Sequence, residues 1–144
     1  MTAITLEPIA SAQSVASESF LQTSSANFSA VGDLNAGWRR IIQQLLVIQT
    51  YRDDDWDGDG ADAIPVGIID SASWLLERLQ STDYPAPSRA TGTPAGTVVF
   101  EWQMAGMYQE IEFVAPGKIE WMRVDHAGQK SHGAASFIHD SKTI

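Results

Sequence analysis

The chain has 144 residues, a formal net charge of −9 at pH 7, 44% hydrophobic residues and five tryptophans. This length suits one domain that buries its own core. The acidic balance argues against direct binding to nucleic acid, whose phosphates require clustered Lys and Arg. The chain contains no cysteine, which excludes disulfides, thiolate catalysis and cysteine-ligated metal sites.

The first segment, residues 1–32, contains no Lys or Arg and mixes Ser, Ala, Thr and Gln with scattered apolar residues. Secretory signals begin with positive charge and mitochondrial signals are rich in Arg, so neither pattern fits. No apolar run reaches the roughly 18 residues that span a membrane. We therefore expect a cytoplasmic protein with an N-terminal arm that is flexible or docked on a partner.

Two helical patterns follow the arm. Apolar side chains recur close to every 3.6 residues over residues 34–51 and again over residues 65–80. Pro65 suits the first turn of the second helix, where its missing N–H costs nothing. Trp74 falls at the edge of that helix's apolar stripe, where it would be an interface anchor if exposed.

Residues 81–96 contain three prolines and several Gly, Ser and Thr residues, which predicts a connecting loop. Three strand patterns follow at residues 97–103, 107–114 and 118–124, because apolar and polar side chains alternate there. The short connections between them contain glycine, which favours an antiparallel meander. The side chains expected to face the helices are Val98, Phe100, Trp102, Ile111, Phe113, Ile119 and Trp121.

These elements predict a single α+β domain over residues 33–125. Its two helices pack on one face of a three- or four-stranded antiparallel meander sheet, with an extended N-terminal arm in front. Residues 126–144 form a C-terminal tail, in which residues 134–139 can form a fourth strand or a short helix.

A candidate cation site lies between the two helices, where residues 53–62 contain six aspartates and two glycines. Asp53, Asp55 and Asp57 reproduce the opening of an EF-hand loop, in which oxygens at alternate positions surround Ca²⁺. The position of the closing bidentate glutamate is Ile64, so water and carbonyl oxygens would have to complete the coordination sphere.

The same loop has a purely structural interpretation. In this interpretation Trp56 is buried in the core, Gly58 and Gly60 adopt positive φ, and the aspartates cap the turn and the next helix. Both interpretations of the loop remain open at the level of the sequence.

A second acidic group lies on the expected strands. The four glutamates share one strand parity, so they are expected on the solvent face of the sheet: Glu101, Glu110, Glu112 and Glu120. Paired carboxylates can perform acid–base chemistry or hold a metal ion. The alternative is an ordinary solvated face whose charges only keep the sheet soluble.

The string Trp56-Asp57-Gly58-Asp59-Gly60-Ala61, followed by Ile64-Pro65, a helix and the Glu101-Trp102 strand, resembles a group of small uncharacterised bacterial proteins. These proteins have a WDGxGA loop between two helices and then a three-stranded meander. The resemblance covers about residues 53–125. It implies a shared fold, and because the group has no known activity it implies no catalytic or cofactor-binding residues.

We expect a non-enzymatic, acidic protein-interaction module that binds or neutralises a basic partner protein, as an antitoxin or inhibitor does. One alternative is a divalent-metal-binding protein, or a metal-dependent hydrolase, that uses the aspartate loop or the glutamate face. A second alternative is a structural component of a larger assembly. Neither nucleic acid nor a membrane is expected as a direct partner.

Overall fold

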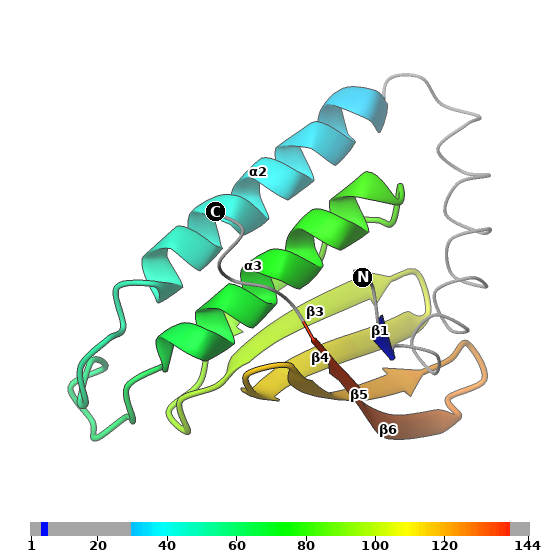
Figure 1. Ribbon diagram of the computed structural model, residues 1–144. Coiled ribbons are helices and arrows are strands. Elements are labelled where there is room, and N and C mark those ends of the chain that lie inside the picture. The colour runs from blue at the N-terminus through cyan, green and yellow to red at the C-terminus, as the bar shows by residue number, and fades with distance from the viewer. Residues whose placement is uncertain (1–3, 6–29, 139–144) are drawn as a thin grey trace.

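The computed structural model describes residues 4–5 and 30–138 and has the predicted α+β class (Figure 1). Within the first 29 residues of the predicted arm, the structure describes only Ile4 and Thr5. The elements in chain order are β1 (Ile4–Thr5), α2 (Ala30–Ile48), α3 (Val66–Ser81), β2 (Arg89–Gly92), β3 (Val98–Met104), β4 (Met107–Ala115), β5 (Lys118–Val124) and β6 (Lys130–Phe137).

The strands form one antiparallel sheet in the order β1-β6-β5-β4-β3-β2. The predicted meander is present as β3, β4 and β5, but the prediction of three or four strands is wrong. The sheet has five strands of four or more residues, with two-residue β1 added at the β6 edge. Strand β6 forms in the predicted C-terminal tail, where a fourth strand or a short helix was expected.

Among the five longer strands, β2 is the one that the sequence did not predict. It lies in the segment read as a loop, between Pro87 and Pro94, and its composition shows no apolar alternation. It becomes a strand because it pairs with β3, with Arg89 directly opposite Glu101. Tertiary pairing therefore overrides a weak local preference.

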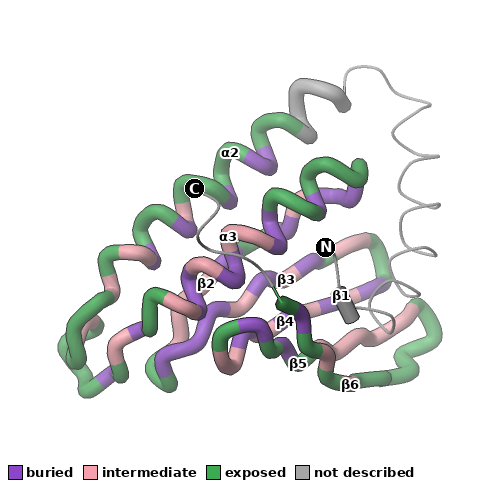
Figure 2. The backbone as a smooth tube through the Cα atoms, in the orientation of Figure 1, coloured by how far each residue is buried: buried purple, intermediate pink, exposed green. Residues whose placement is uncertain are grey.

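The two helices lie side by side over one face of the sheet, and the core fills the space between the layers (Figures 1 and 2). Helix α2 packs against β2, and α3 packs against β4 and β3. Strand alternation sends every second side chain into this core. Trp121 lies on the inward face as predicted but is only half-buried. The other predicted inward residues are buried: Val98, Phe100, Trp102, Ile111, Phe113 and Ile119.

Two polar side chains join the helices to the sheet. Gln44 of α2 accepts a hydrogen bond from the backbone N–H of Ala90 in β2 at 2.7 Å. Buried Ser71 of α3 accepts one from the N–H of Gly117, in the β4–β5 turn, at 2.8 Å. These bonds satisfy backbone groups that would otherwise lose hydrogen bonds on burial, so they help to set where each helix sits.

Candidate functional site

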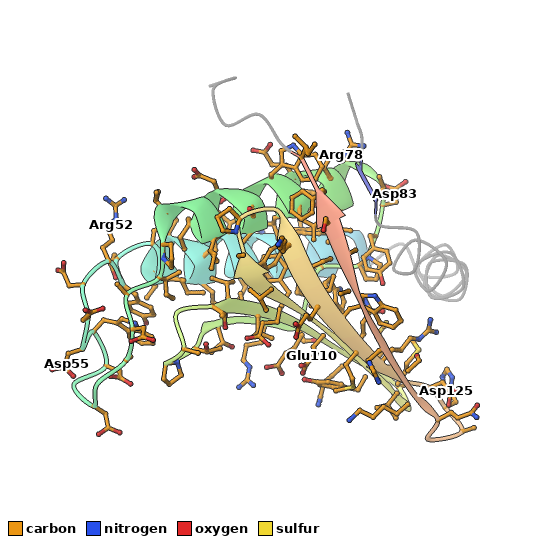
Figure 3. The ribbon with its side chains drawn as sticks, turned by 60° about the horizontal axis from the view of Figure 1, so that its bottom comes forward. Arg52, Asp55, Arg78, Asp83, Glu110 and Asp125 are labelled. Carbon is orange, nitrogen blue, oxygen red and sulfur yellow. The ribbon has the colours of Figure 1, made fainter. Side chains whose placement is uncertain are left out.

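The helices cover one face of the sheet and leave the other face open. Figure 3 shows Glu110 on the side of the sheet away from the helices. All four predicted glutamates lie on this open face, because their strand parity is opposite to that of the buried residues. We call this surface the acidic face and define it by Glu101, Glu110, Glu112 and Glu120.

The glutamates of the acidic face form two pairs across neighbouring strands. Glu101 lies directly opposite Glu110, and Glu112 lies directly opposite Glu120. Each pair belongs to a row that crosses the five longer strands. The first row is Arg89, Glu101, Glu110, Met122 and His132, and the second row is Thr91, Val99, Glu112, Glu120 and Ala134.

The first pair is compensated by neighbouring side chains. The Nη2 of Arg89 donates to both carboxylate oxygens of Glu101, at 3.1 and 2.8 Å, and the hydroxyl of Tyr108 donates to Glu110 at 2.7 Å. The bond to Glu101 raises the pKa of the Arg89 guanidinium. Burial raises the pKa of the Tyr108 hydroxyl, and the bond to Glu110 raises it further, so this hydroxyl stays a donor.

The second pair has weaker compensation. Glu112 accepts one hydrogen bond from the neutral hydroxyl of Thr97, at 2.6 Å. Glu120 is exposed and has no ion pair or hydrogen bond among the residues that the structure describes. Like charges directly opposite each other across two strands repel. A positive group from outside the chain would therefore be stabilised most at Glu112 and Glu120.

An open hollow of about 480 Å³ lies over this second pair. Its lining includes Glu110, Glu112, Glu120 and Met122, with Lys130 and His132 from β6. The hollow is thus acidic towards β4 and β5 and bears basic residue types on its β6 side. The sequence did not reveal the β6 residues, because the Gly, Ala and Ser residues of that strand hide its alternation.

The aspartate loop uses its carboxylates internally. Asp54, Asp55 and Asp57 each turn one carboxylate oxygen back onto backbone N–H groups, at 2.7–3.1 Å. These bonds join Asp55 to Gly60, Asp57 to Asp59 and Ala61, and Asp54 to Ala63. The loop N–H groups therefore take the place that a cation occupies in an EF-hand loop.

The structure does not gather the predicted calcium ligands Asp53, Asp55 and Asp57 into a metal-binding group. Within residues 4–5 and 30–138, no cluster of three or more His, Asp or Glu side chains could hold a metal ion. The physical reason is that the oxygens of Asp55 and Asp57 converge on their own backbone. The glutamates of the acidic face, which lie along extended strands, form no such cluster either.

The predicted backbone turns at Gly58 and Gly60 are confirmed, with φ of 77° and 89°. Asp55 also has positive φ, 65°, a conformation that aspartate tolerates better than most residues. Trp56 is half-buried, so the predicted full burial is wrong. Its ring stacks on Tyr51 with centroids 4.0 Å apart, and its Nε1–H donates to the carbonyl of Asp62 at 2.7 Å.

The predicted interface anchor Trp74 is already in contact with the chain itself. Its ring stacks on Phe137 of β6 with centroids 5.0 Å apart, and the Arg78 guanidinium lies 5.5 Å from its ring centre. The side chain is half-buried. Trp74 therefore contributes to holding the end of β6 on α3.

No protein-family model, curated protein or solved structure matches this chain. In the part of the chain that the structure describes, neither helix combines the length and the apolar character needed to cross a bilayer. The interpretation of the acidic face therefore depends on its geometry and chemistry alone.

Proposed function

We propose that the protein is a non-enzymatic interaction module whose acidic face binds a basic partner protein. The observation that carries the proposal is the pair Glu112 and Glu120, two carboxylates directly opposite each other on an open sheet face. Binding would place a Lys or Arg side chain of the partner between them.

The two opposed carboxylates repel each other in the unbound protein. Opposed like charges in a cross-strand pair cost roughly 0.2–1 kcal/mol relative to a neutral pair. A cation placed between them adds two attractions, which together outweigh this repulsion. The net charge of −9 also speeds the encounter with a basic partner through long-range attraction.

The hollow suits an arginine side chain in particular. A planar guanidinium presents donors in a fork that can bridge two carboxylates, whereas a lysine ammonium acts as a point charge. Met122 lies in the same hollow, two residues after Glu120 and on the same face of β5, and offers apolar contact to the methylene stem of such a side chain.

The test compares two doubly neutralised variants in affinity capture from native lysate, with the bound proteins identified by mass spectrometry. The first variant, Glu112→Gln with Glu120→Gln, removes the two charges but retains an acceptor for Thr97. The control, Asp59→Asn with Asp62→Asn, removes the same number of charges from the aspartate loop. Both aspartates are exposed, and neither side chain accepts a hydrogen bond from the described residues.

We expect a basic partner that the unmodified protein and the aspartate control capture, and that the glutamate variant does not. Equal loss in both variants would mean that binding follows bulk charge and not this face. Retention by both variants would contradict the proposal outright.

A further inference from the structure

The helix layer carries an exposed apolar surface that is separate from the acidic face. Ile42 and Leu46 of α2 are 39% and 55% exposed. They border a groove of about 270 Å³ between α2 and α3, whose other wall includes Leu76 and Glu77 of α3. Figure 2 shows exposed residues along the length of α2. Exposed apolar side chains grouped beside a groove are typical of a docking surface.

The spacing of residues on α2 suits a second helix. Asn35, Arg39, Ile42, Leu46 and Gln49 are alternately four and three residues apart, which is the spacing of a coiled-coil seam. A bond of 2.9 Å from the N–H of Gln49 to the carbonyl of Leu45 continues the helical turn to the end of this seam. We call these five residues the α2 seam.

We propose that two copies of the chain form a homodimer by packing their α2 seams antiparallel. The charge distribution along the helix selects both the partner and the direction. Exposed Arg39 and Arg40 lie at the middle of α2. Its C-terminal end is followed by exposed Arg52 and then by exposed Asp53, Asp54 and Asp55, so the charge beyond that end is net negative. Antiparallel packing brings the arginines of each copy towards the aspartates of the other, whereas parallel packing would bring like charges together.

The register follows from the apolar residues. When Ile42 lies opposite Leu46 of the second copy, Arg39 lies opposite the second copy's Gln49. The aspartates begin four residues beyond Gln49, in the loop that follows the helix. Because the same surface is used twice, the interface is closed and stops at two copies.

The proposed dimer does not depend on the proposed function, because the α2 seam lies in the helix layer and the acidic face lies on the far side of the sheet (Figures 1 and 3). A dimer would carry two acidic faces on its outer sides. Two such faces would strengthen binding to a partner that presents more than one basic site.

The test measures mass by size-exclusion chromatography with light scattering over a range of protein concentrations. We expect twice the chain mass of 15.7 kDa for the unmodified protein. Leu46→Glu should raise the dimer dissociation constant about tenfold or more, because it places a carboxylate in the apolar seam. The matched control is Val47→Glu, which should remain dimeric. The exposed fraction of Val47, 53%, is close to the 55% of Leu46, but Val47 points about 100° away from Leu46 around the helix axis.

A cysteine experiment tests the direction of packing, and it is clean because the chain has no cysteine of its own. Under mild oxidation Ile42→Cys with Leu46→Cys should form a covalent dimer, and Arg39→Cys should not. A monomeric unmodified protein at all concentrations would overturn the proposal. A dimer unaffected by Leu46→Glu, or efficient cross-linking of Arg39→Cys, would overturn the seam or its direction. Circular dichroism confirms that each variant is folded.

Discussion

Replacing Glu120 with glutamine should stabilise the isolated protein while weakening its binding to a basic partner. Glu120 is exposed and lies directly opposite Glu112. Its replacement removes the repulsion between the two carboxylates and breaks no hydrogen bond among the described residues. A residue that destabilises the free fold but supports binding is expected at an interaction surface and not in an ordinary solvated sheet.

The magnitude follows from the geometry of the pair. Directly opposite side chains in an antiparallel sheet place their charges about 6 Å apart, and two unit charges at that distance in water repel by about 0.7 kcal/mol. For a domain of this size, such a gain raises the midpoint of thermal unfolding by roughly 2 °C. Salt should remove most of the gain, because the Debye length falls from about 10 Å at 0.1 M to about 3 Å at 1 M.

The assay is thermal unfolding in low salt and in 1 M salt, with Glu101→Gln as the control. Glu101 is also opposite a glutamate, but it is bonded to Arg89, so its neutralisation should not stabilise the protein. A lower midpoint for Glu120→Gln, or a gain that persists undiminished in 1 M salt, would refute the electrostatic reasoning.

Three further outcomes are expected. Ser71→Ala should lower the free energy of unfolding, measured in urea, by about 1–3 kcal/mol, because it leaves the buried N–H of Gly117 without its acceptor. An equal loss for Ser73→Ala would contradict this role of Ser71. Trp56→Phe should cost only about 1 kcal/mol, since the ring stack survives and one hydrogen bond is lost; a cost of about 3–5 kcal/mol would indicate a fully buried site. The pKa of Tyr108 is raised in the folded protein, so this hydroxyl contributes stability that is present below the ordinary pKa of 10.0 and is lost as the pH rises above that value. The Tyr108→Phe variant should therefore lose less stability between pH 9 and 11 than the unmodified protein. Identical pH profiles would exclude that contribution.

Much of the fold was predictable because the local periodicity of apolar residues indicates it. The two helices, the three central strands and the parity of their side chains follow from apolar spacing, and the glycines of the aspartate loop follow from the backbone conformations that only glycine adopts freely. The shared face of the four glutamates also follows, since strand parity survives any error in strand boundaries.

The aspartate loop shows where sequence spacing is insufficient. The same residue types can surround a cation or accept hydrogen bonds from their own backbone, and the two arrangements differ only in side-chain direction. The positive φ of Asp55 and the bonds of Asp57 to two N–H groups give the loop its second arrangement. Neither feature has a distinct signal in the order of residues.

The sequence by itself determined the α+β class, the inward and outward faces of the central strands and the presence of two acidic regions, because each depends on contacts between near neighbours in the chain. Only the tertiary structure decided that Arg89–Gly92 is an edge strand, that Arg89 neutralises Glu101, and that Glu120 has no such partner among the described residues. It also decided that Trp74 is covered by Phe137, while Leu46 is left exposed. These outcomes depend on the register between segments far apart in sequence, and register is set by the packing of the whole domain and not by any one segment.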